Sequence, residues 1–374
     1  MLKKRNLILI IFFLITVIFS YTSIIFCSNK YTKEENNKVI KNHTIKTHSW
    51  YNTGHHNLDG GFINPWEKEF ESPGFKGFMW VMGKLFKFID YPKTPSVEIN
   101  KKILFSKNPE FKIFWIGHAT TLIKLGDLYI ITDPVFSLTA GPTSFTGTSR
   151  KTPPAIEISN LPDIDIVLIS HNHYDHLDKS SILEIKEKFN PLFMVPLNVK
   201  ETLLDWDITN VIELDWYQYI EYNNLQINCT PAKHFSQRSI ADRDETLWAS
   251  WYVKSINSKY SFFFAGDTAY SPHFKEIGEK LGAPTAALMP IGAYKPRWFM
   301  SRVHVNPQEA LQGFLDMKAE NFIAIHWGTF ALADEPFHEP MKETTKIAKE
   351  MQISAEKIHI LPIGGYFSVD GKNE

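Results

Sequence analysis

The chain has 374 residues, of which 44% are hydrophobic and 14% aromatic, and its formal net charge at pH 7 is −1. This length accommodates one large α/β catalytic domain with an N-terminal extension. The near-zero net charge gives no electrostatic basis for nucleic-acid binding, so we expect no nucleic-acid partner. Of the two cysteines, Cys27 lies inside an apolar run and Cys229 in an expected buried strand, so a structural disulfide is not expected.

The N-terminus carries an anchor-like signal. Three basic residues at positions 3–5 precede an uncharged apolar run, Leu7–Cys27, which as a helix would cross roughly 30 Å of hydrocarbon. A signal-peptide core is usually shorter and ends at small residues in an A-x-A-like pattern, to which the nearby candidates, Ser20 with Thr22 or Ser23, are poor matches. We therefore expect residues 1–30 to be an uncleaved signal anchor, with the catalytic domain on the non-cytoplasmic side. A cleaved signal peptide, giving a secreted or periplasmic protein, is the alternative.

Residues 31–100 are predicted to form a linker followed by an aromatic-rich extension. Ser28–Ser49 is polar and rich in Lys, Asn and Thr. The aromatic residues that follow are Trp50, Tyr51, Phe62, Trp66, Phe70, Phe75, Phe78, Trp80, Phe86 and Phe88. One hypothesis is that they pack against the main domain. The other is that they form an apolar lip that enters a membrane or lines an acyl channel, for which Pro296–Met300 is a second candidate.

The strongest motif follows a predicted buried strand, Ile164–Ser170. It has the order H-x-H-x-D-H, and its side chains are His171, His173, Asp175 and His176. A helix is expected from Asp178, a candidate cap, to Phe189. Imidazole and carboxylate together suit zinc first, with iron or manganese as alternatives, and this many ligands in one turn indicates two metal sites. A histidine-rich surface loop with incidental metal affinity is the other interpretation.

Further candidate ligands follow three more predicted strands. Leu225–Thr230 is followed by His234, Tyr260–Ala265 by Asp267, and Phe322–Ile325 by His326. Because each candidate lies just past a strand end, the strand ends are expected to converge on one point. The sequence thus supplies seven ligands, which suffices for two metals if one carboxylate bridges them.

These residues resemble the metallo-β-lactamase superfamily. The resemblance implies a four-layer αββα sandwich with a dinuclear site at one edge, between the two sheets. One metal would be held by His171, His173 and His234, the other by Asp175, His176 and His326, with Asp267 bridging them. Asp133 matches an upstream aspartate of the family, whose implied role is to accept a proton from a ligating imidazole and so orient it.

Four segments narrow the resemblance to the N-acyl-phosphatidylethanolamine-hydrolysing phospholipase D branch. They are Trp115–Thr120, Pro231–Phe235, Pro290–Met300 and Ala324–Phe330. The likeness runs from about Gly61 to Gly365, and residues 101–374 are expected to form the hydrolase domain. It implies a membrane-associated enzyme with two zinc ions. A hydroxide bridging these ions would attack N-acyl-phosphatidylethanolamine, releasing N-acylethanolamine and phosphatidic acid. The resemblance also implies a homodimer.

Beside the ligands, several residues are candidates for catalysis or substrate contact. His304 is expected to contact the phosphate or protonate the leaving oxygen, with a structural loop histidine as the alternative. His118 would orient a ligand or be structural, and Tyr174 would orient substrate or pack. Lys233 and Arg238, which flank His234, would attract an anionic head group, although surface cations usually have no such role.

Two other functions were weighed. A hydrolase of the same fold acting on a lactone, a cyclic phosphodiester or another lipid is the main alternative. A metal-binding protein without activity would have lost a ligand, and none is lost here. Antibiotic cleavage is disfavoured because Asp175 beside His176, with an aspartate bridge at Asp267, resembles the phosphodiesterase-like members.

Overall fold

The structure is a computed structural model that describes residues 44–67, 74–84, 91, 93–108, 110–143 and 146–369. The predicted membrane segment Leu7–Cys27 lies outside these residues. Within the described ranges, none of the helices combines the length and apolarity that crossing a bilayer requires.

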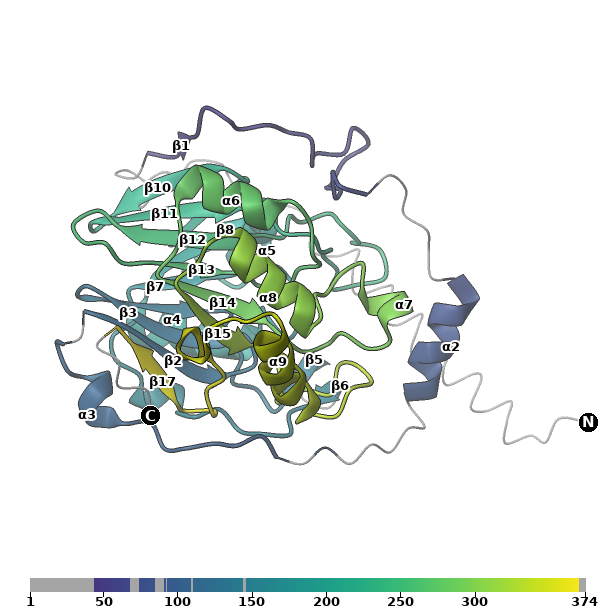
Figure 1. Cartoon of the computed structure of the whole chain (residues 1–374). Coiled ribbons are helices and arrows are strands. Elements are labelled where there is room, and N and C mark those ends of the chain that lie inside the picture. Colours follow the sequence, from purple (N-terminus) through teal and green to yellow (C-terminus); the bar gives the residue numbers. More distant parts are fainter. Residues whose placement is uncertain are drawn as a thin grey trace, which may run out of the picture. The chain divides into compact units, whose positions relative to one another are not determined.

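Two β-sheets form the centre of the fold (Figure 1). The larger sheet has, in spatial order, β1 (Lys46–Thr47), β10 (Gln218–Tyr222), β11 (Leu225–Thr230), β12 (Ser250–Ser255), β13 (Ser261–Phe264), β14 (Ala286–Pro290), β15 (Asn321–Ile325) and β16 (Ile358–His359). The smaller sheet has β17 (Tyr366–Ser368), β2 (Phe111–Gly117), β3 (Thr120–Leu125), β4 (Leu128–Thr132), β7 (Ile166–Leu168), β8 (Leu192–Pro196) and β9 (Val211–Leu214). A hairpin of β5 (Thr139–Thr143) and β6 (Thr146–Ser149) is separate from both.

Helices cover the outer faces of both sheets. The helices are α2 (Gly74–Lys84), α3 (Lys101–Leu104), α4 (Lys179–Phe189), α5 (Val199–Leu204), α6 (His273–Leu281), α7 (Arg297–Met300), α8 (Pro307–Asp316) and α9 (Glu339–Glu350). Apolar side chains of α4 and α5 pack with the smaller sheet, and those of α6 and α8 pack with the larger sheet, over which both lie in Figure 1. This layer order is the αββα sandwich that the family resemblance implies.

The main hydrophobic core lies between the two sheets. Trp115 and Ile123 of the smaller sheet belong to the same buried cluster as Trp251 and Phe264 of the larger sheet. All four side chains are fully buried. At about 25 cal/mol per Å² of apolar surface, this burial is the main stabilising contribution to the sandwich.

Most predicted elements around the motif are observed, with small shifts at their ends. The expected strand 164–170 is the shorter β7, the expected helix is α4, and β11 has the predicted bounds. Asp178 occupies the N-cap position of α4, but its side chain makes no capping hydrogen bond to the helix backbone. It accepts hydrogen bonds from the Ser181 hydroxyl and from the Ser137 backbone N–H instead. The predicted position of Asp178 at the helix start is therefore confirmed, but the predicted capping hydrogen bond is not formed.

Part of the expected N-terminal extension packs on the main domain. β1 pairs with β10, Phe62 is buried in the main core, and Trp50, Tyr51 and Trp66 pack against it. These contacts favour the packing hypothesis for these aromatic residues. Phe70, Phe86 and Phe88 lie outside the described residues, as do the side chains of Phe75 and Phe78.

Strand direction brings the candidate ligands to one edge of the sandwich. β4 and β7 run parallel in the smaller sheet, and β13, β14 and β15 run parallel in the larger sheet. The carboxyl ends of parallel strands meet at one edge, where loops can place side chains together. The loops after these ends carry Asp133, His171, Asp267 and His326.

Candidate metal centre

The H-x-H-x-D-H segment forms a tight loop between β7 and α4. The His173 carbonyl accepts hydrogen bonds from the backbone N–H groups of His176 and Leu177. A guanidinium nitrogen of Arg238 donates to the Asn172 carbonyl at 2.6 Å and to the Leu177 carbonyl at 2.8 Å. The loop is therefore held at both ends by one partly buried cation.

The first group of ligand atoms consists of His171, His173 and His234. His171 Nε2 lies 2.8 Å from His173 Nδ1, and His234 Nε2 lies 3.3 Å from the same atom. His234 Nδ1 donates to the Val303 carbonyl at 2.8 Å, which leaves Nε2 directed at the other two rings. These are the three residues expected at one metal.

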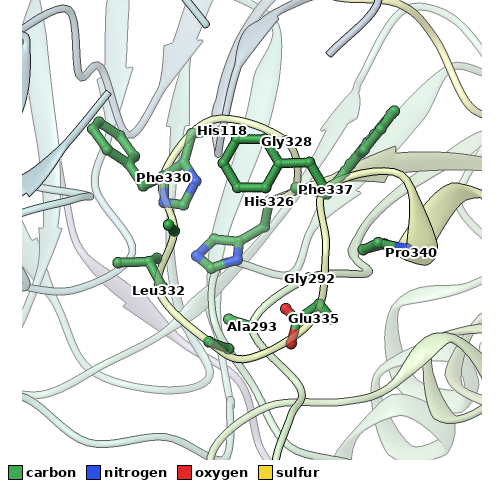
Figure 2. A pocket seen from close by; sticks show the side chains of 13 residues that line it. His118, Gly292, Ala293, His326, Gly328, Phe330, Leu332, Glu335, Phe337 and Pro340 are labelled. Carbon is green, nitrogen blue, oxygen red and sulfur yellow. The ribbon is translucent and has the colours of Figure 1, made fainter. Parts of the chain in front are cut away.

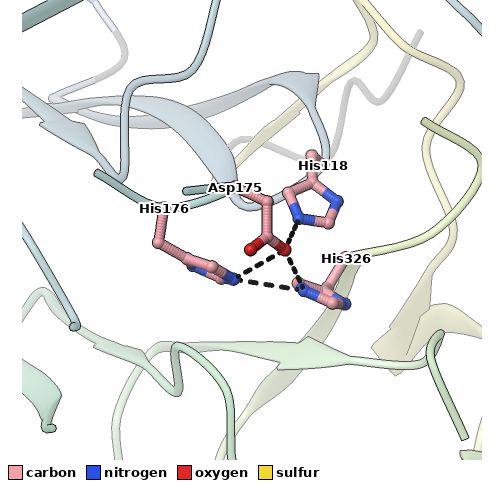
Figure 3. A group of neighbouring side chains, drawn as sticks. All are labelled: His118, Asp175, His176 and His326. Carbon is pink, nitrogen blue, oxygen red and sulfur yellow. Dashed lines mark hydrogen bonds and ion pairs between the residues drawn. The ribbon is translucent and has the colours of Figure 1, made fainter. Parts of the chain in front are cut away.

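The second group consists of His118, Asp175, His176 and His326 (Figure 3). Asp175 Oδ2 lies 2.9 Å from His118 Nε2, 3.4 Å from His176 Nε2 and 3.6 Å from His326 Nε2. His176 Nε2 and His326 Nε2 are 3.2 Å apart. His118 thus joins the three residues expected at the second metal, through a contact to Asp175.

Asp267 lies between the two groups. Its Oδ1 is 3.0 Å from His326 Nε2, and its Oδ2 is 3.2 Å from His176 Nε2 and 3.7 Å from His234 Nε2. Gly266 precedes it with a φ of +58°, and a Cβ there would lie 2.5 Å from the Cβ of Ser170. Only glycine fits this turn, which turns the Asp267 carboxylate toward both groups.

The spacing of these atoms fits metal ligation. Four donors about 2.0–2.1 Å from a tetrahedral zinc ion stand roughly 3.3 Å apart, close to the separations of 2.8–3.7 Å among the site atoms. Three ring nitrogens converge in the first group, and an N–H···N hydrogen bond would pair only two of them, whereas a cation accepts all three lone pairs. Asp267 Oδ1 and His326 Nδ1 are buried without a hydrogen-bond partner among the described residues.

A second histidine cluster, His55 and His56 with Asp215, differs from the candidate metal centre in its contacts. His55 Nε2 and His56 Nε2 lie 2.6 and 2.8 Å from the two oxygens of Asp215, and the Tyr51 hydroxyl donates to the same carboxylate at 2.7 Å. Each ring nitrogen faces a carboxylate oxygen that accepts its N–H, and the Tyr51 hydroxyl donates to the same carboxylate, so hydrogen bonds satisfy these contacts without a cation. We therefore assign this cluster as a hydrogen-bonded tether and not as a metal site.

The electrostatics of the site favour cation binding. Burial lowers the pKa of His173 to about 3 and that of His234 to about 4, so both rings are neutral at pH 7. Burial opposes ionisation of Asp267, but His176 and His326 outweigh it and hold its pKa well below the usual range. Burial also opposes charge on His326, yet Asp267 raises the pKa of that ring to about 9. Asp267 therefore remains anionic, with neutral His173 and His234 on one side and a proton-binding His326 on the other. A divalent cation at His326 would take the place of that proton, because metal binding requires the neutral imidazole.

Asp133 supports the ligands from behind. Its Oδ2 lies 2.6 Å from His176 Nδ1, and its Oδ1 accepts from the Ser170 backbone N–H at 2.7 Å. The Ser170 hydroxyl bonds to Asp133 Oδ2 and lies 2.9 Å from His171 Nδ1. Asp133 is thus placed to orient one ring directly and a second through Ser170, and nothing in the sequence analysis pointed to Ser170.

The remaining candidates are divided between the site and the scaffold. His304 lies at the site: its Nδ1 is 3.9 Å from Asp267 Oδ2 and is buried without a hydrogen-bond partner among the described residues. The Tyr174 hydroxyl donates to the Arg238 carbonyl, and the Arg238 guanidinium lies 4.0 Å from the centre of the Tyr174 ring. Lys233 pairs with Glu67 at 3.2 Å. These contacts favour packing roles for Tyr174, Lys233 and Arg238.

Cavities border the centre on two sides. A small cavity of about 20 Å³ is lined by His118, His326, Phe330, Leu332 and Glu335, among others (Figure 2). A larger one of about 240 Å³ reaches His234. Its apolar lining residues are Phe62, Ile63, Phe235, Trp248 and Val303, and its basic ones are Arg243 and Arg302.

A known protein family matches the part of the chain that forms this site. The family described as "Beta-lactamase superfamily domain" matches residues 129–327, a span that includes the H-x-H-x-D-H loop, His234, Asp267 and His326. The chain belongs to the metallo-β-lactamase superfamily.

Relatives narrow the family further. An N-acyl-phosphatidylethanolamine-hydrolyzing phospholipase D 1 of Caenorhabditis elegans is 39% identical over 244 residues, which cover 62% of this chain and 68% of that protein. The mitochondrial protein of the same name from Saccharomyces cerevisiae is 36% identical over 255 residues, covering 65% of this chain and 53% of that protein. The chain is thus a metal-dependent hydrolase of the superfamily, similar to these phospholipases D.

A solved structure supports the fold. A metallo hydrolase from the archaeon Ignicoccus hospitalis aligns with a TM-score of 0.52 at 20% identity, over 69% of this chain and 98% of that one. This likeness concerns the sandwich alone.

Proposed function

We propose that the protein is a membrane-associated phosphodiesterase with two zinc ions, which hydrolyses N-acyl-phosphatidylethanolamine to N-acylethanolamine and phosphatidic acid. The observation that carries the proposal is the position of Asp267 between the two groups of ligand atoms. Its Oδ1 lies 3.0 Å from His326 Nε2 of the second group, and its Oδ2 lies 3.7 Å from His234 Nε2 of the first group. A carboxylate between two such groups is suited to bridging a pair of metal ions. The similarity to the two phospholipases D supports the choice of substrate.

The proposed ligands follow from the two groups. His171, His173 and His234 would hold one ion, and Asp175, His176 and His326 the other, with Asp267 shared. When bound, the ions would lower the pKa of a water molecule and neutralise charge on the phosphodiester. Iron and manganese are alternatives that fit the same donors. His118, whose Nε2 faces Asp175 at 2.9 Å, would hold that carboxylate in place.

His304 is our candidate for the group that contacts the phosphate or protonates the leaving oxygen. In the reaction, a phosphorus–oxygen bond forms to water as the bond to the ethanolamine oxygen breaks, and that oxygen must gain a proton. The Arg297 guanidinium donates to the His304 carbonyl at 2.9 Å and pairs with Glu309 at 2.8 Å, so the His304 backbone is fixed. The free Nδ1 beside Asp267 is positioned for this contact.

The larger cavity suits part of a lipid. Its apolar wall borders His234, which suits an acyl chain or glyceryl group. Its two arginines pair with acidic residues of the same lining, Arg243 with Asp244 and Arg302 with Glu67. We propose membrane association through residues 7–27, either as an uncleaved anchor or during export as a signal. We also propose a homodimer, which light scattering on the purified protein would test.

The central experiment is product identification by mass spectrometry. The full chain in detergent, loaded with zinc, would be incubated with N-acyl-phosphatidylethanolamine beside the variant Asp267→Asn. We expect N-acylethanolamine and phosphatidic acid from the parent, and a loss of at least about 10³-fold in the variant, because the variant lacks the bridging carboxylate. Two bound zinc ions without product would exclude the lipid assignment and direct attention to lactones and cyclic phosphodiesters.

His304 has a separate prediction. His304→Gln should lower turnover by about 10²-fold, the usual loss for a general acid, while the zinc content stays at the parent's value. Metal analysis and steady-state kinetics on the same preparation would distinguish the two effects. Unchanged turnover would exclude His304 from the reaction, and loss of zinc would assign it to metal binding.

A further inference from the structure

One surface of the protein combines exposed aromatic and thioether side chains with lysine. We call it the α2–α7 patch and define it by Lys76, Met79 and Trp80 of α2 and Trp298 and Phe299 of α7. Met79 is 52% exposed and Trp298 is 42% exposed. The tilted rings of Trp80 and Phe299 pack with their centres 4.8 Å apart, and Lys76 Nζ lies 4.2 Å from the centre of the Trp298 ring. The two helices therefore form one continuous surface.

The composition of α2 is unusual for a helix on a water-facing surface. Its sequence is GFKGFMWVMGK, in which the charged residues are Lys76 and Lys84 and no residue is acidic. Helices that lie in a membrane interface combine Trp, Phe and other apolar residues with Lys or Arg in this way. Tryptophan in particular prefers the level of the lipid head groups.

The patch is continuous with the wall of the metal centre. Trp80, Phe299 and Leu332 pack on a small buried cluster of Ala293, Met300 and Ala333. Ala293, Leu332 and Ala333 also line the cavity that contains His118 and His326, and Figure 2 shows Leu332 and Ala293 in this wall. One layer of small apolar side chains thus separates the surface from the ligands.

The acidic groups beside the patch are already engaged. Asp334 accepts a hydrogen bond from Trp80 Nε1 at 2.9 Å, and Glu339 pairs with Lys295 at 2.7 Å. Lys295 and Glu339 therefore neutralise each other, whereas Lys76 forms no ion pair with a carboxylate among the described residues. The charge that α2 itself presents is basic, which complements anionic lipid.

We propose that the α2–α7 patch docks on an anionic lipid bilayer, with Met79 and Trp298 entering the head-group region, and so holds the metal centre against the surface that contains its substrate. The docking itself does not depend on which lipid is cleaved; only its purpose rests on the proposed function. A second copy of the chain is the competing occupant of the same surface.

The test uses an environment-sensitive fluorophore on the full chain. Cys27 is first replaced by Ser so that the label does not attach there. Cys229 can stay, because it is fully buried and will not react. Met79→Cys or Trp298→Cys is then labelled, with Ile256→Cys as the matched control. Ile256 is also about half exposed, but it lies in the turn before β13, at the opposite end of that strand from Asp267.

We expect phosphatidylglycerol vesicles to raise the emission at positions 79 and 298 at least about twofold with a blue shift, and to leave position 256 unchanged. Phosphatidylcholine vesicles should give a smaller response. No response at positions 79 and 298, or an equal response at position 256, would overturn the proposal. A blue shift without vesicles that grows with protein concentration would assign the patch to a second copy and would likewise overturn it.

An activity readout separates docking from the proposed function. Trp298→Ala and Met79→Gln should lower hydrolysis of vesicle-embedded N-acyl-phosphatidylethanolamine about tenfold, while turnover of the soluble diester bis(p-nitrophenyl) phosphate stays at the parent's value. A parent that responds by fluorescence but cleaves no lipid would refute the proposed function alone. Variants that cleave vesicle lipid as fast as the parent would refute the docking alone.

Discussion

At the scale of single residues, the centre depends on backbone conformations that side chains rarely adopt. His118, Asp133 and His326 all have positive φ angles, of 55°, 33° and 59°. Such conformations cost on the order of 1–3 kcal/mol each and persist where the surrounding structure requires them. Each of the three residues directly follows a strand, so the left-handed turn redirects its side chain from the sheet into the site.

Asp133→Asn tests the support behind the ligands. Both carboxylate oxygens of Asp133 act as acceptors, one toward the Ser170 N–H and one toward His176 Nδ1. The amide of asparagine has one oxygen and one NH2 group, so it cannot accept both hydrogen bonds, and the His176 ring loses its fixed orientation. We expect zinc affinity to fall about 10–100-fold with little change in fold. Competition with a chelator of known affinity measures the change, and circular dichroism checks the fold. Zinc affinity equal to that of the parent would show that Ser170 alone orients the rings.

At the scale of elements, the strand ends assemble the site and the N-terminal tether secures one side of it. Residues 51–56 reach the carboxylate of Asp215, which follows β9, through Tyr51, His55 and His56. His55 also stacks on Trp216, with ring centres 4.2 Å apart. The same segment continues to Asn64, whose side chain donates to the His234 carbonyl at 2.8 Å. The tether thus connects the end of β9, in the smaller sheet, to a residue of the candidate metal centre.

Asp215→Asn tests the tether. Burial raises the pKa of Asp215, but hydrogen bonds from His55 and Tyr51 outweigh it, so the folded pKa lies below 3.8. Just below pH 3.8 the folded state therefore binds fewer protons than the unfolded state. The ionised Asp215 carboxylate thus contributes to the free energy of unfolding above that pH, and this contribution is lost as the pH falls through the folded pKa.

We expect the variant to lose about 1–3 kcal/mol of unfolding free energy at pH 7. The difference from the parent should shrink between pH 4 and pH 3. Urea unfolding across this range measures both effects. Asp59→Asn, at an exposed position of the same segment, serves as the matched control and should change nothing. A difference that is independent of pH would show that the charge of Asp215 is not what holds the tether.

At the scale of the whole molecule, the metal centre joins the two sheets. Its ligands come from loops of both, so a bound ion cross-links the sandwich at the edge where the core ends. Without a cation, facing imidazole nitrogens and buried carboxylates oppose this closure. Metal binding should therefore contribute to the stability of the entire domain as well as to its chemistry.

Removal of metal tests this coupling. A ligand present at 1,000 times its Kd stabilises the folded state by about 4 kcal/mol, which corresponds to a Tm change of roughly 5–10 °C for a domain of this size. Chelation should lower the Tm by that amount, and added zinc should restore it. Calorimetry gives the values, and Asp267→Asn should show a smaller shift. An identical Tm with and without chelator would contradict the coupling.

Local patterns in the sequence determined the candidate ligand set, the strands before it and the family. The H-x-H-x-D-H motif and the strands that end just before His234, Asp267 and His326 are patterns of residues close together in the chain. They can therefore be recognised in the sequence without the structure. The sandwich and the metal-dependent hydrolase assignment followed from them and are supported by the family match.

Only the tertiary structure decided which side chains meet across long separations in the chain. The contact of His118 with Asp175, the use of Tyr174 and Arg238 as scaffold, and the tether at Asp215 all join residues far apart in sequence. No periodicity encodes such contacts, because they arise from the packing of two sheets against each other. The positive φ angles at the strand ends have the same origin, since the fold imposes them and the residue types alone do not favour them.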